Sequence, residues 1–594
     1  MEQLQHNGVL VPSRYQRKNL AIKILGEKIT LTQKQEEMAF AWVKKLGTIY
    51  VEDSVFTKNF YLDFSKELNF KVKPNDVDYY EVLSFIEKMR LLRVNLSKEE
   101  KKQLSYKRKS EREKNKAYYG YAWVDGDQME IANYMVEPSS IFIGRGKHPL
   151  RGHWKEGPRE EDIELNLSPN IPVPQGRWKG IVWRFNSMWI GRWHDKLTDK
   201  LKYVWLSESS VLKQKKDIEK FNKAKELHQK IRKVQRYILK NLNAENVKRR
   251  KIATVCFLIY HLNLRVGDEK DLDEADTVGA STLRSEHITF NSDDTVTFNF
   301  LGKDSIPYLF KTKMPKKVIS NLKDFVVEAQ NTLFDGVSSK QVSKFLDEVM
   351  TGLSAKVFRT FYASKAVRAK LEKIHINSTD PEYIKKYTAS MANIEAAKIC
   401  NHRRSIPRTW ASSLEKKKKR LKVLRIRAKS FQYKLKKKAN LRKVRYAERL
   451  CKFEATLKVM NEKLLDYKQQ RITKKQQGKV VHSLEKRISK KQKAIMQQKK
   501  RLKTFKIHHT TQMKKLNQRL NDRKQRDNVA IDKQKHRISR QKETRDYNLT
   551  TSLKSYIDPR IFYAWGKKHD YDWKKYYSKN LQKKFIWVEL NSTS

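Results

Sequence analysis

The sequence predicts a multidomain α/β protein with four parts: a mixed α/β N-terminal region, a mainly helical region with a small antiparallel sheet, a long helical hairpin, and a small helical C-terminal region. Three observations lead to this prediction. The chain has 594 residues, enough for several domains. Glycine and proline cluster in its first third, where strand-like and helical segments alternate. Between Glu415 and Arg545, in contrast, there is no proline and a single glycine, which favours long helices.

The N-terminal region is expected to cover residues 1–206. Clusters such as FIGRGKHPLRG and NLSPNIPVPQGRWKG interrupt short strand-like and helical segments. Within this region, residues 33–46 and 78–94 carry helical periodicity, and a charged run follows them. This pattern predicts a nested subdomain at about residues 26–111.

The second region, residues 207–411, is mainly helical by pattern. One segment, SEHITFNSDDTVTFNFLGKDSIPYLF, alternates in hydrophobicity around a central SDD turn, which predicts a hairpin followed by a third strand. Lys303 would then lie at a turn between strands. The longest mostly apolar run, Ala253 to Leu264, is shorter than the roughly 18–20 residues needed to cross a bilayer, so it is expected to be a buried core helix.

The third region, residues 412–545, has about 47 basic and 10 acidic residues between Glu415 and Arg545. Gly478 lies near its midpoint, which predicts two helices that fold back at QQG and form an antiparallel coiled coil. Arms of about 60 residues at ~1.5 Å per residue would extend roughly 90 Å. The expected seam positions are Leu414, Leu421, Leu424, Phe431, Leu435 and Leu441, then Leu484, Ile488, Ile495 and Leu502. A partly disordered linker is the alternative, because so many like charges repel one another.

The net charge of +64 indicates a polyanionic partner, with nucleic acid as the first candidate. A membrane-surface protein would need an amphipathic apolar face or a lipid anchor, and the sequence has neither pattern. The three cysteines form no CxxC pair, which fits a reducing compartment. The KKKKR run at Lys416 to Arg420 could be a nuclear localisation signal or simply a solvated helical face.

Five residues far apart in the sequence have the chemistry to cut and rejoin a phosphodiester without a metal. The forked guanidinium groups of Arg265 and Arg359 match two phosphate oxygens, and His402 offers a third donor. Lys303 could protonate a leaving oxygen, and Tyr556, in the C-terminal region at residues 546–594, could be the nucleophile. Each of these residues alone would more often be an ordinary structural or solvated side chain.

The joint occurrence of their motifs changes that judgement. LRxGxEK, ADTVG, LGKDS, AKVFRT, CNH and SYxDPR follow one another along the chain, and HNGVLVPSRY, FIGRGKHP and FIWVEL extend the match from residue 6 to residue 590. In these motifs and their order the chain resembles the eukaryotic type IB DNA topoisomerases.

The resemblance implies a fold and a reaction. The N-terminal region would be a DNA-binding cap, residues 207–411 the catalytic core, residues 412–545 a basic linker, and the whole a monomeric clamp that encircles double-stranded DNA in the nucleus. Tyr556 would form a transient 3′-phosphotyrosyl bond, the other strand would rotate to relax supercoils of either sign, and the 5′-hydroxyl would reseal the nick. Neither ATP nor a metal or other cofactor is expected.

The resemblance also implies further DNA-binding residues. These are Arg145, Lys270, Asp304, Asn401 and Ser555. Two positions depart from the usual pattern of the family: Asp268 stands where Asn is usual, and Ser555 stands where Asn usually precedes the nucleophile. These departures affect the local contacts expected near the phosphate.

Two other functions remain open from the sequence. A tyrosine recombinase has a similar set of residues, but the long basic insertion between His402 and Tyr556 disfavours it. A non-catalytic basic chromatin or nucleic-acid-binding protein would act through charge alone and would not need Tyr556. The sequence contains no P-loop, and the acidic stretch DEKDLDEAD lacks the central glycine of a calcium loop, so no metal site is predicted.

Overall fold

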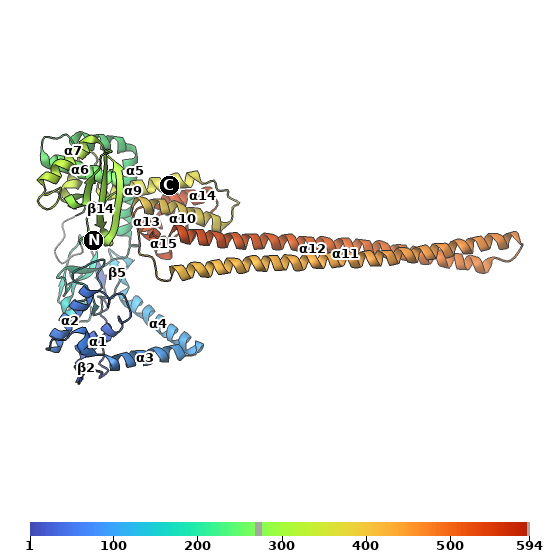
Figure 1. Cartoon of the computed structure of the whole chain (residues 1–594), viewed down its shortest axis with the longest axis horizontal. Coiled ribbons are helices and arrows are strands. Elements are labelled where there is room, and N and C mark those ends of the chain that lie inside the picture. Colours follow the sequence, from blue (N-terminus) through green and yellow to red (C-terminus); the bar gives the residue numbers. More distant parts are fainter. Residues whose placement is uncertain (268–275, 591–594) are drawn as a thin grey trace. The chain divides into compact units, whose positions relative to one another are not determined.

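The computed structural model of this protein describes residues 1–267 and 276–590, together with all of their side chains except that of Asp304 (Figure 1). The chain divides into two compact units. The first contains Met1–Thr379, Ala392–Arg404 and Tyr547–Ser594, and the second contains Asp380–Met391 and Ser405–Asp546. The candidate catalytic residues all belong to the first unit.

Two small sheets in the N-terminal region share one hydrophobic core. Antiparallel strands β1 (Leu4–His6), β5 (Tyr121–Val124) and β6 (Asp127–Glu130) make the first sheet. The second has the order β10 (Gly180–Val182), β9 (Glu164–Asn166), β11 (Trp189–His194) and β12 (Leu201–Trp205), and only its β10–β9 pair is parallel. Buried side chains from both sheets, such as Leu4, Leu165 and Ile190, share one hydrophobic core. The mixed α/β character expected of this region is confirmed.

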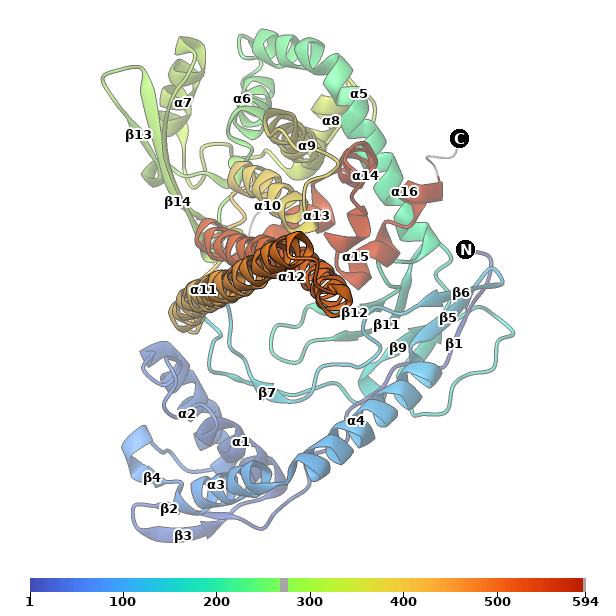
Figure 2. The same ribbon diagram turned by 90° about the vertical axis from the view of Figure 1, so that its right-hand side faces the viewer.

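A second hydrophobic core lies in the predicted nested segment. Strands β2 (Ala21–Ile24), β3 (Glu27–Thr30) and β4 (Val77–Asp78) pack with helices α1 (Gln33–Val43), α2 (Ser54–Leu68) and α3 (Tyr80–Asn95) (Figure 2). Thr32 and Asp53 cap the first two helices by accepting hydrogen bonds from backbone N–H groups of their first turns. The core is aromatic, and the rings of Trp42 and Phe60 stack with centroids 4.3 Å apart. Helix α4 (Lys98–Tyr119) is the charged run and buries no residue.

A short hairpin displays the FIGRG sequence. Strands β7 (Ser140–Ile141) and β8 (Trp154–Lys155) pair, and the loop between them is fixed on α2. The Asn59 amide donates to the carbonyls of Pro149 and Arg151, and Asp63 accepts from the ring of His153.

The region expected at residues 207–411 is mainly helical, as predicted. It contains α5 (Val211–Asn241), α6 (Val247–Leu262), α7 (Lys316–Glu328), α8 (Ser339–Asp347), α9 (Ala355–Lys373) and α10 (Glu382–Ile399). The side chains of residues 253–260 in α6 are all buried, so the apolar run is a core helix, as expected from its length. None of the helices in the described ranges is long and apolar enough to cross a membrane.

The predicted antiparallel sheet of this region is also confirmed. Strands β13 (Ile288–Phe290), β14 (Thr295–Gly302) and β15 (Ile306–Lys313) pair in sequence order. The SDD turn joins the first two strands, and the 3-10 turn η5 (Lys303–Ser305) joins the last two. Lys303 therefore lies at a turn between strands, as predicted.

The second unit contains the helical hairpin. Helix α11 (Trp410–Gln476) and helix α12 (His482–Glu543) run antiparallel, and Gly478 lies in the turn with φ of 69° (Figure 1). The two helices occur as the sequence predicted, rather than as the disordered alternative. In α11 the less exposed side chains recur every three or four residues from Leu414 to Arg471, which is the spacing of a coiled coil.

Two expected seam positions are wrong. Phe431 is 39% exposed and Leu441 is 50% exposed. Two successive four-residue steps after Leu424 move the seam, so that Gln432 and Arg442 occupy the positions expected for these residues. Arg442 donates to Gln512 of α12, and Arg523 lies over the ring of Phe431. The seam is therefore partly polar.

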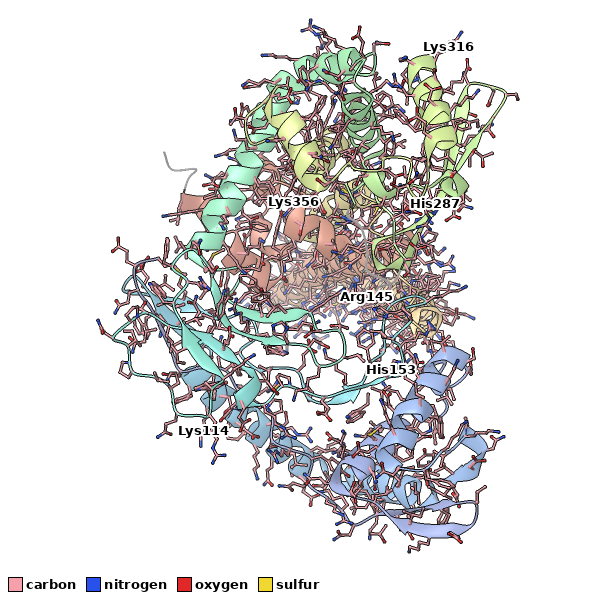
Figure 3. The ribbon with its side chains drawn as sticks, turned by 90° about the vertical axis from the view of Figure 1, so that its left-hand side faces the viewer. Lys114, Arg145, His153, His287, Lys316 and Lys356 are labelled. Atoms are coloured by element: carbon pink, nitrogen blue, oxygen red, sulfur yellow. The ribbon has the colours of Figure 1, made fainter. Side chains whose placement is uncertain are left out.

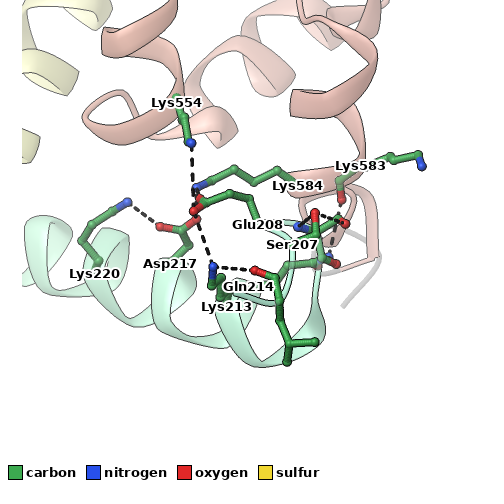
Figure 4. A network of polar contacts seen from close by, with 11 residues as sticks. Ser207, Glu208, Lys213, Gln214, Asp217, Lys220, Lys554, Lys583 and Lys584 are labelled. Carbon is green, nitrogen blue, oxygen red and sulfur yellow. Dashed lines mark hydrogen bonds and ion pairs between the residues drawn. The ribbon is translucent and has the colours of Figure 1, made fainter. Parts of the chain in front are cut away.

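The C-terminal region is small and helical, with α13 (Leu549–Ser555), α14 (Pro559–Lys568), α15 (Lys579–Lys584) and α16 (Trp587–Leu590). Ion pairs attach it to the first turns of α5 (Figure 4). The almost fully buried ammonium of Lys584 contacts the carboxylates of Glu208 and Asp217, the latter at 2.8 Å. Glu208 also lies 4.0 Å from Lys554, two residues before Tyr556.

Candidate active site

Arg265 is held by two glycines that pack against each other. Gly267 has φ of 93°, and a Cβ on Gly279 would lie only 2.4 Å from the Cα of Gly267, so the two backbones could not approach with larger residues. The Ala280 N–H donates to the Arg265 carbonyl at 2.8 Å. The close contact between LRVG and TVG thus explains why both motifs contain glycine, and it fixes the backbone of Arg265.

Lys303 begins the η5 turn at the end of β14. Its predecessor Gly302 lies against the ring of Tyr308, where an added Cβ would come within 2.7 Å of a ring carbon. The Lys303 side chain is exposed and faces the same cavity as Arg265 and His402. A long, flexible cation is therefore placed at the mouth of this cavity.

His402 follows the end of α10 and is 5% exposed. Its carbonyl accepts from the Asn548 N–H at 2.7 Å, and its Nδ1 lies 2.8 Å from the hydroxyl of Ser552. Burial, with added repulsion from Arg359 and Arg265, lowers the pKa of His402 to about 3. The ring is therefore neutral at pH 7.

Arg359, on α9, is 2% exposed. Its guanidinium donates to the carbonyl of Asn263 and, at 2.8 Å, to that of Cys400. These carbonyls follow α6 and α10, so Arg359 joins the segments that carry Arg265 and His402. Its Nε, like Nε2 of His402, is a buried nitrogen without a hydrogen-bond partner among the described residues.

Tyr556 follows directly after α13 and is 6% exposed. The centroids of the Tyr556 and His402 rings are 5.0 Å apart. The guanidinium carbon of Arg359 lies 5.0 Å from the centroid of the Tyr556 ring. The hydroxyl of Ser364 donates to the Tyr556 carbonyl at 3.2 Å and accepts from the Asp558 N–H at 3.0 Å. The tyrosine is thereby held beside two of the candidate phosphate-binding groups.

Three of the five predicted catalytic residues line one cavity. Its lining includes Arg265, Lys303, Asn401 and His402, with Tyr308, Asn548 and Thr551. Tyr556 adjoins it through its ring contact with His402, and Arg359 through its hydrogen bond to the carbonyl of Cys400, which also lines the cavity. Nε of Arg359 and Nε2 of His402 are buried without a partner among the described residues. Because a buried donor without a partner costs about 1–3 kcal/mol, these two nitrogens favour an anion as the occupant. A phosphate that meets three cationic side chains and a neutral imidazole N–H fits this chemistry.

The other predicted DNA-binding residues are less closely grouped. Arg145 is exposed on the β7–β8 loop (Figure 3), and its neighbour Gly146 lies against Ser305 of η5, where an added Cβ would be 2.0 Å from the Ser305 hydroxyl. Ser555, directly before Tyr556, is partly buried. Asp304 lies in η5, but its side chain is not described, and Lys270 lies outside the described residues.

Two serines at this site, Ser364 and Ser552, were not predicted from the sequence. Ser364 lies in the AKVFRTFYAS segment five residues after Arg359, and Ser552 lies one helical turn before Tyr556. A single hydroxyl carries no pattern of its own, so only the nearness of these serines to Arg359 and Tyr556 could have drawn attention to them.

Within the described ranges, no group of three or more His, Cys, Asp or Glu residues is arranged to hold a metal ion.

Three family profiles match the chain in succession. The profile of the eukaryotic DNA topoisomerase I DNA binding fragment matches residues 1–206, that of the catalytic core of the same enzymes matches residues 209–437, and that of the C-terminal topoisomerase domain matches residues 528–593. The matched ranges of this chain include the residues that line the cavity and Tyr556.

Individual relatives agree with the profiles. DNA topoisomerase 1 beta of Arabidopsis thaliana is 32% identical over 596 residues, which cover 98% of this chain and 58% of the relative. DNA topoisomerase 1 of Candidozyma auris is 30% identical over 619 residues, covering 98% and 81%. The human DNA topoisomerase 1 is 29% identical over 605 residues, covering 98% and 70%. This chain therefore spans a little over half of the Arabidopsis protein and most of the other two.

Proposed function

Because this chain belongs to the eukaryotic DNA topoisomerase I family, we propose that it is a type IB DNA topoisomerase that relaxes positive and negative supercoils by nicking and resealing one strand of a duplex. The observation that carries the proposal is the cavity that contains Arg265, Lys303 and His402 beside Tyr556 and Arg359. These groups supply a nucleophile, donors for the phosphate oxygens and a proton source.

In the cleavage step, the Tyr556 oxygen attacks the phosphorus and its proton passes to water. Negative charge grows on the non-bridging oxygens, where Arg265, Arg359 and the Nε2–H of His402 bind it more tightly as it develops. The bond between phosphorus and the 5′-oxygen then breaks, and its electron pair leaves with that oxygen. The Lys303 ammonium protonates this leaving group.

In the resealing step the same groups act in reverse. The 5′-hydroxyl gives its proton back to Lys303 and attacks the 3′-phosphotyrosyl phosphorus, and the bond to the Tyr556 oxygen breaks. The energy of the phosphodiester is kept in the protein–DNA ester, so the cycle uses neither ATP nor a metal ion. Between the two steps, rotation of the two strands about each other changes the linking number.

We propose that binding is dominated by contacts to phosphates rather than to base edges, because the chain has 130 Lys and Arg against 66 Asp and Glu. Arg145, Lys270, Asp304, Asn401 and Ser555 are the proposed additional contacts near the nick. A monomeric clamp that closes on DNA in the nucleus remains part of the proposal.

A plasmid relaxation assay tests the proposal. Purified protein should relax both positively and negatively supercoiled plasmid in EDTA and without ATP, and denaturation during the reaction should trap protein attached to 3′-ends. A strict need for magnesium would contradict the metal-free mechanism. Tight DNA binding with neither relaxation nor a trapped complex would instead support a non-catalytic nucleic-acid-binding protein.

A further inference from the structure

The hydroxyl of Ser552 is buried and has one partner. Ser552 has no exposed surface, and its Oγ lies 2.8 Å from Nδ1 of His402. Among the described residues no other hydrogen-bond partner of this hydroxyl is present. A hydroxyl has one hydrogen to donate, and leaving it unsatisfied in the interior costs about 1–3 kcal/mol.

The two possible directions of this hydrogen bond differ in which donor they leave unpaired. If Nδ1 carried the ring hydrogen, it would donate to the serine oxygen, and the serine hydrogen would have no acceptor. If Nδ1 is unprotonated, it accepts the serine hydrogen, and the neutral ring must carry its hydrogen on Nε2. The first arrangement leaves the serine hydrogen unpaired in the interior, whereas the second leaves the Nε2–H, which belongs to a residue that lines the cavity and can donate to a bound phosphate.

This choice of tautomer decides what the second ring nitrogen of His402, Nε2, offers to a ligand. Nε2 of His402 is buried and has no partner among the described residues, and His402 lines the cavity together with Arg265 and Lys303. We propose that Ser552 is a positioning residue that selects the Nε2–H tautomer of His402, so that the ring meets the scissile phosphate as a hydrogen-bond donor. In the other tautomer, Nε2 would turn a lone pair toward a phosphate oxygen and repel it.

The same serine also sets the position of the nucleophile. Its carbonyl accepts from the N–H groups of Tyr556 and Ile557, both at 3.0 Å. One residue thus joins the tautomer of His402 to the backbone that presents Tyr556. Helix α13 is also tied to His402 at its N-cap, where the Asn548 N–H donates to the His402 carbonyl.

The role in cleavage rests on the proposed function, but the tautomer itself does not. In protein labelled with ¹⁵N-histidine at pH 7, the signal that disappears in His402→Gln should show a protonated Nε2 and an unprotonated Nδ1. This measurement is made on the unaltered chain without DNA. A protonated Nδ1 would overturn the proposal whether or not the protein cleaves DNA.

Single-turnover cleavage of a nicked or partly duplex substrate tests the functional consequence. Ser552→Ala should slow formation of the covalent complex about 10-fold or more, with little change in duplex affinity measured in a Tyr556→Phe background. Thr550→Ala, which removes an exposed hydroxyl from the same helix, is the matched control and should not change the rate.

A double-mutant cycle separates tautomer selection from a general structural role. Glutamine at position 402 offers an amide donor that has no tautomers, so adding Ser552→Ala to His402→Gln should change the rate less than about 2-fold. Equal slowing in both backgrounds would overturn the proposal, as would a wild-type rate in Ser552→Ala. If the unaltered protein forms no covalent complex at all, the proposed topoisomerase function fails instead, and the labelling result still decides the tautomer.

Discussion

Ser364 holds the backbone on both sides of Ile557, the residue that follows Tyr556. Its hydroxyl, which projects from α9, donates to the carbonyl of Tyr556 and accepts from the N–H of Asp558. Because Arg359 lies on the same helix, α9 places both a phosphate-binding group and the support of the nucleophile. The relative position of these two groups therefore does not depend on the linker that separates them in sequence.

Ser364→Ala should slow cleavage about 10-fold without a matching loss of DNA affinity. The change removes two hydrogen bonds, each contributing about 1 kcal/mol, and lets the tyrosine backbone shift relative to Arg359. The measurement is the single-turnover rate of covalent complex formation. Ser354→Ala, at the start of the same helix where the serine makes no capping hydrogen bond, is the matched control.

Tyr556→Phe should bind duplex DNA almost normally and form no covalent complex, because only the attacking oxygen is lost. Trapping on plasmid DNA after denaturation measures the complex, and a gel-shift titration measures the affinity. Tyr563→Phe provides the control in the same region. Relaxation by Tyr556→Phe near the wild-type rate would mean that another tyrosine attacks, although burial keeps the pKa of Tyr577 well above its usual value and disfavours that alternative.

Lys303→Ala should slow cleavage by about 10²- to 10⁴-fold, the usual contribution of a general acid. A substrate with sulfur at the 5′-bridging position should largely rescue this variant, because a thiolate leaves without a proton. The rates of both substrates with both proteins are compared under single-turnover conditions. Equal slowing on the two substrates would show that Lys303 stabilises charge but does not donate the proton.

Replacing residues 416–542 by a short flexible linker should leave strand cleavage intact, since every proposed catalytic residue lies outside this segment. DNA binding should weaken, and its salt dependence should become shallower by a slope of roughly 0.9 for each phosphate contact that is lost. Titrations at several salt concentrations measure the slope. An unchanged slope would show that the basic hairpin does not contact DNA.

His402 should make folding stability depend on acid pH. Burial and the neighbouring Arg359 and Arg265 lower its pKa from 6.5 to about 3 in the folded protein, so between these values the unfolded chain binds a proton that the folded one does not. Stability contributed by the neutral ring is full above pH 6.5 and falls by about 1.4 kcal/mol per pH unit below it.

Urea unfolding of wild type and His402→Gln at pH 7, 6 and 5 measures this effect. The free energy of unfolding should fall more steeply with decreasing pH in the wild-type protein than in His402→Gln. At pH 5 the two slopes should differ by about one bound proton, or ~1.4 kcal/mol per pH unit. His6, whose pKa burial lowers to about 4, contributes equally to both proteins and cancels in the comparison. Parallel curves would mean that His402 is accessible to protons in the folded state.

The parts of the fold that follow from local periodicity were predictable. The apolar run of α6, the alternation of β13 to β15 and the proline-free hairpin each contain their own signal. The register of the coiled coil was harder to predict than these elements. Gln432 and Arg442 occupy seam positions, and no hydrophobic pattern marks them. A shift of the seam by one residue then moves Phe431 and Leu441 toward solvent.

The site was predictable in its residue types but not in its supports. The sequence indicated Arg359 as a phosphate ligand, yet its two observed hydrogen bonds go to the carbonyls of Asn263 and Cys400, because tertiary packing brings the ends of α6 and α10 to this helix. Ser364 lies 192 residues from Tyr556 in the chain. No local pattern reports a contact over such a separation, so these bonds become visible only once the helices are packed.

The two carbonyls that bind Arg359 have a thermodynamic consequence. An arginine side chain free in solvent explores many rotamers, and fixing it loses about 2 kcal/mol of conformational entropy. Here the rotamer is already frozen in the unliganded protein, with one nitrogen of the fork still able to donate. That loss is incurred once, when the chain folds, and is not repeated each time a phosphate arrives.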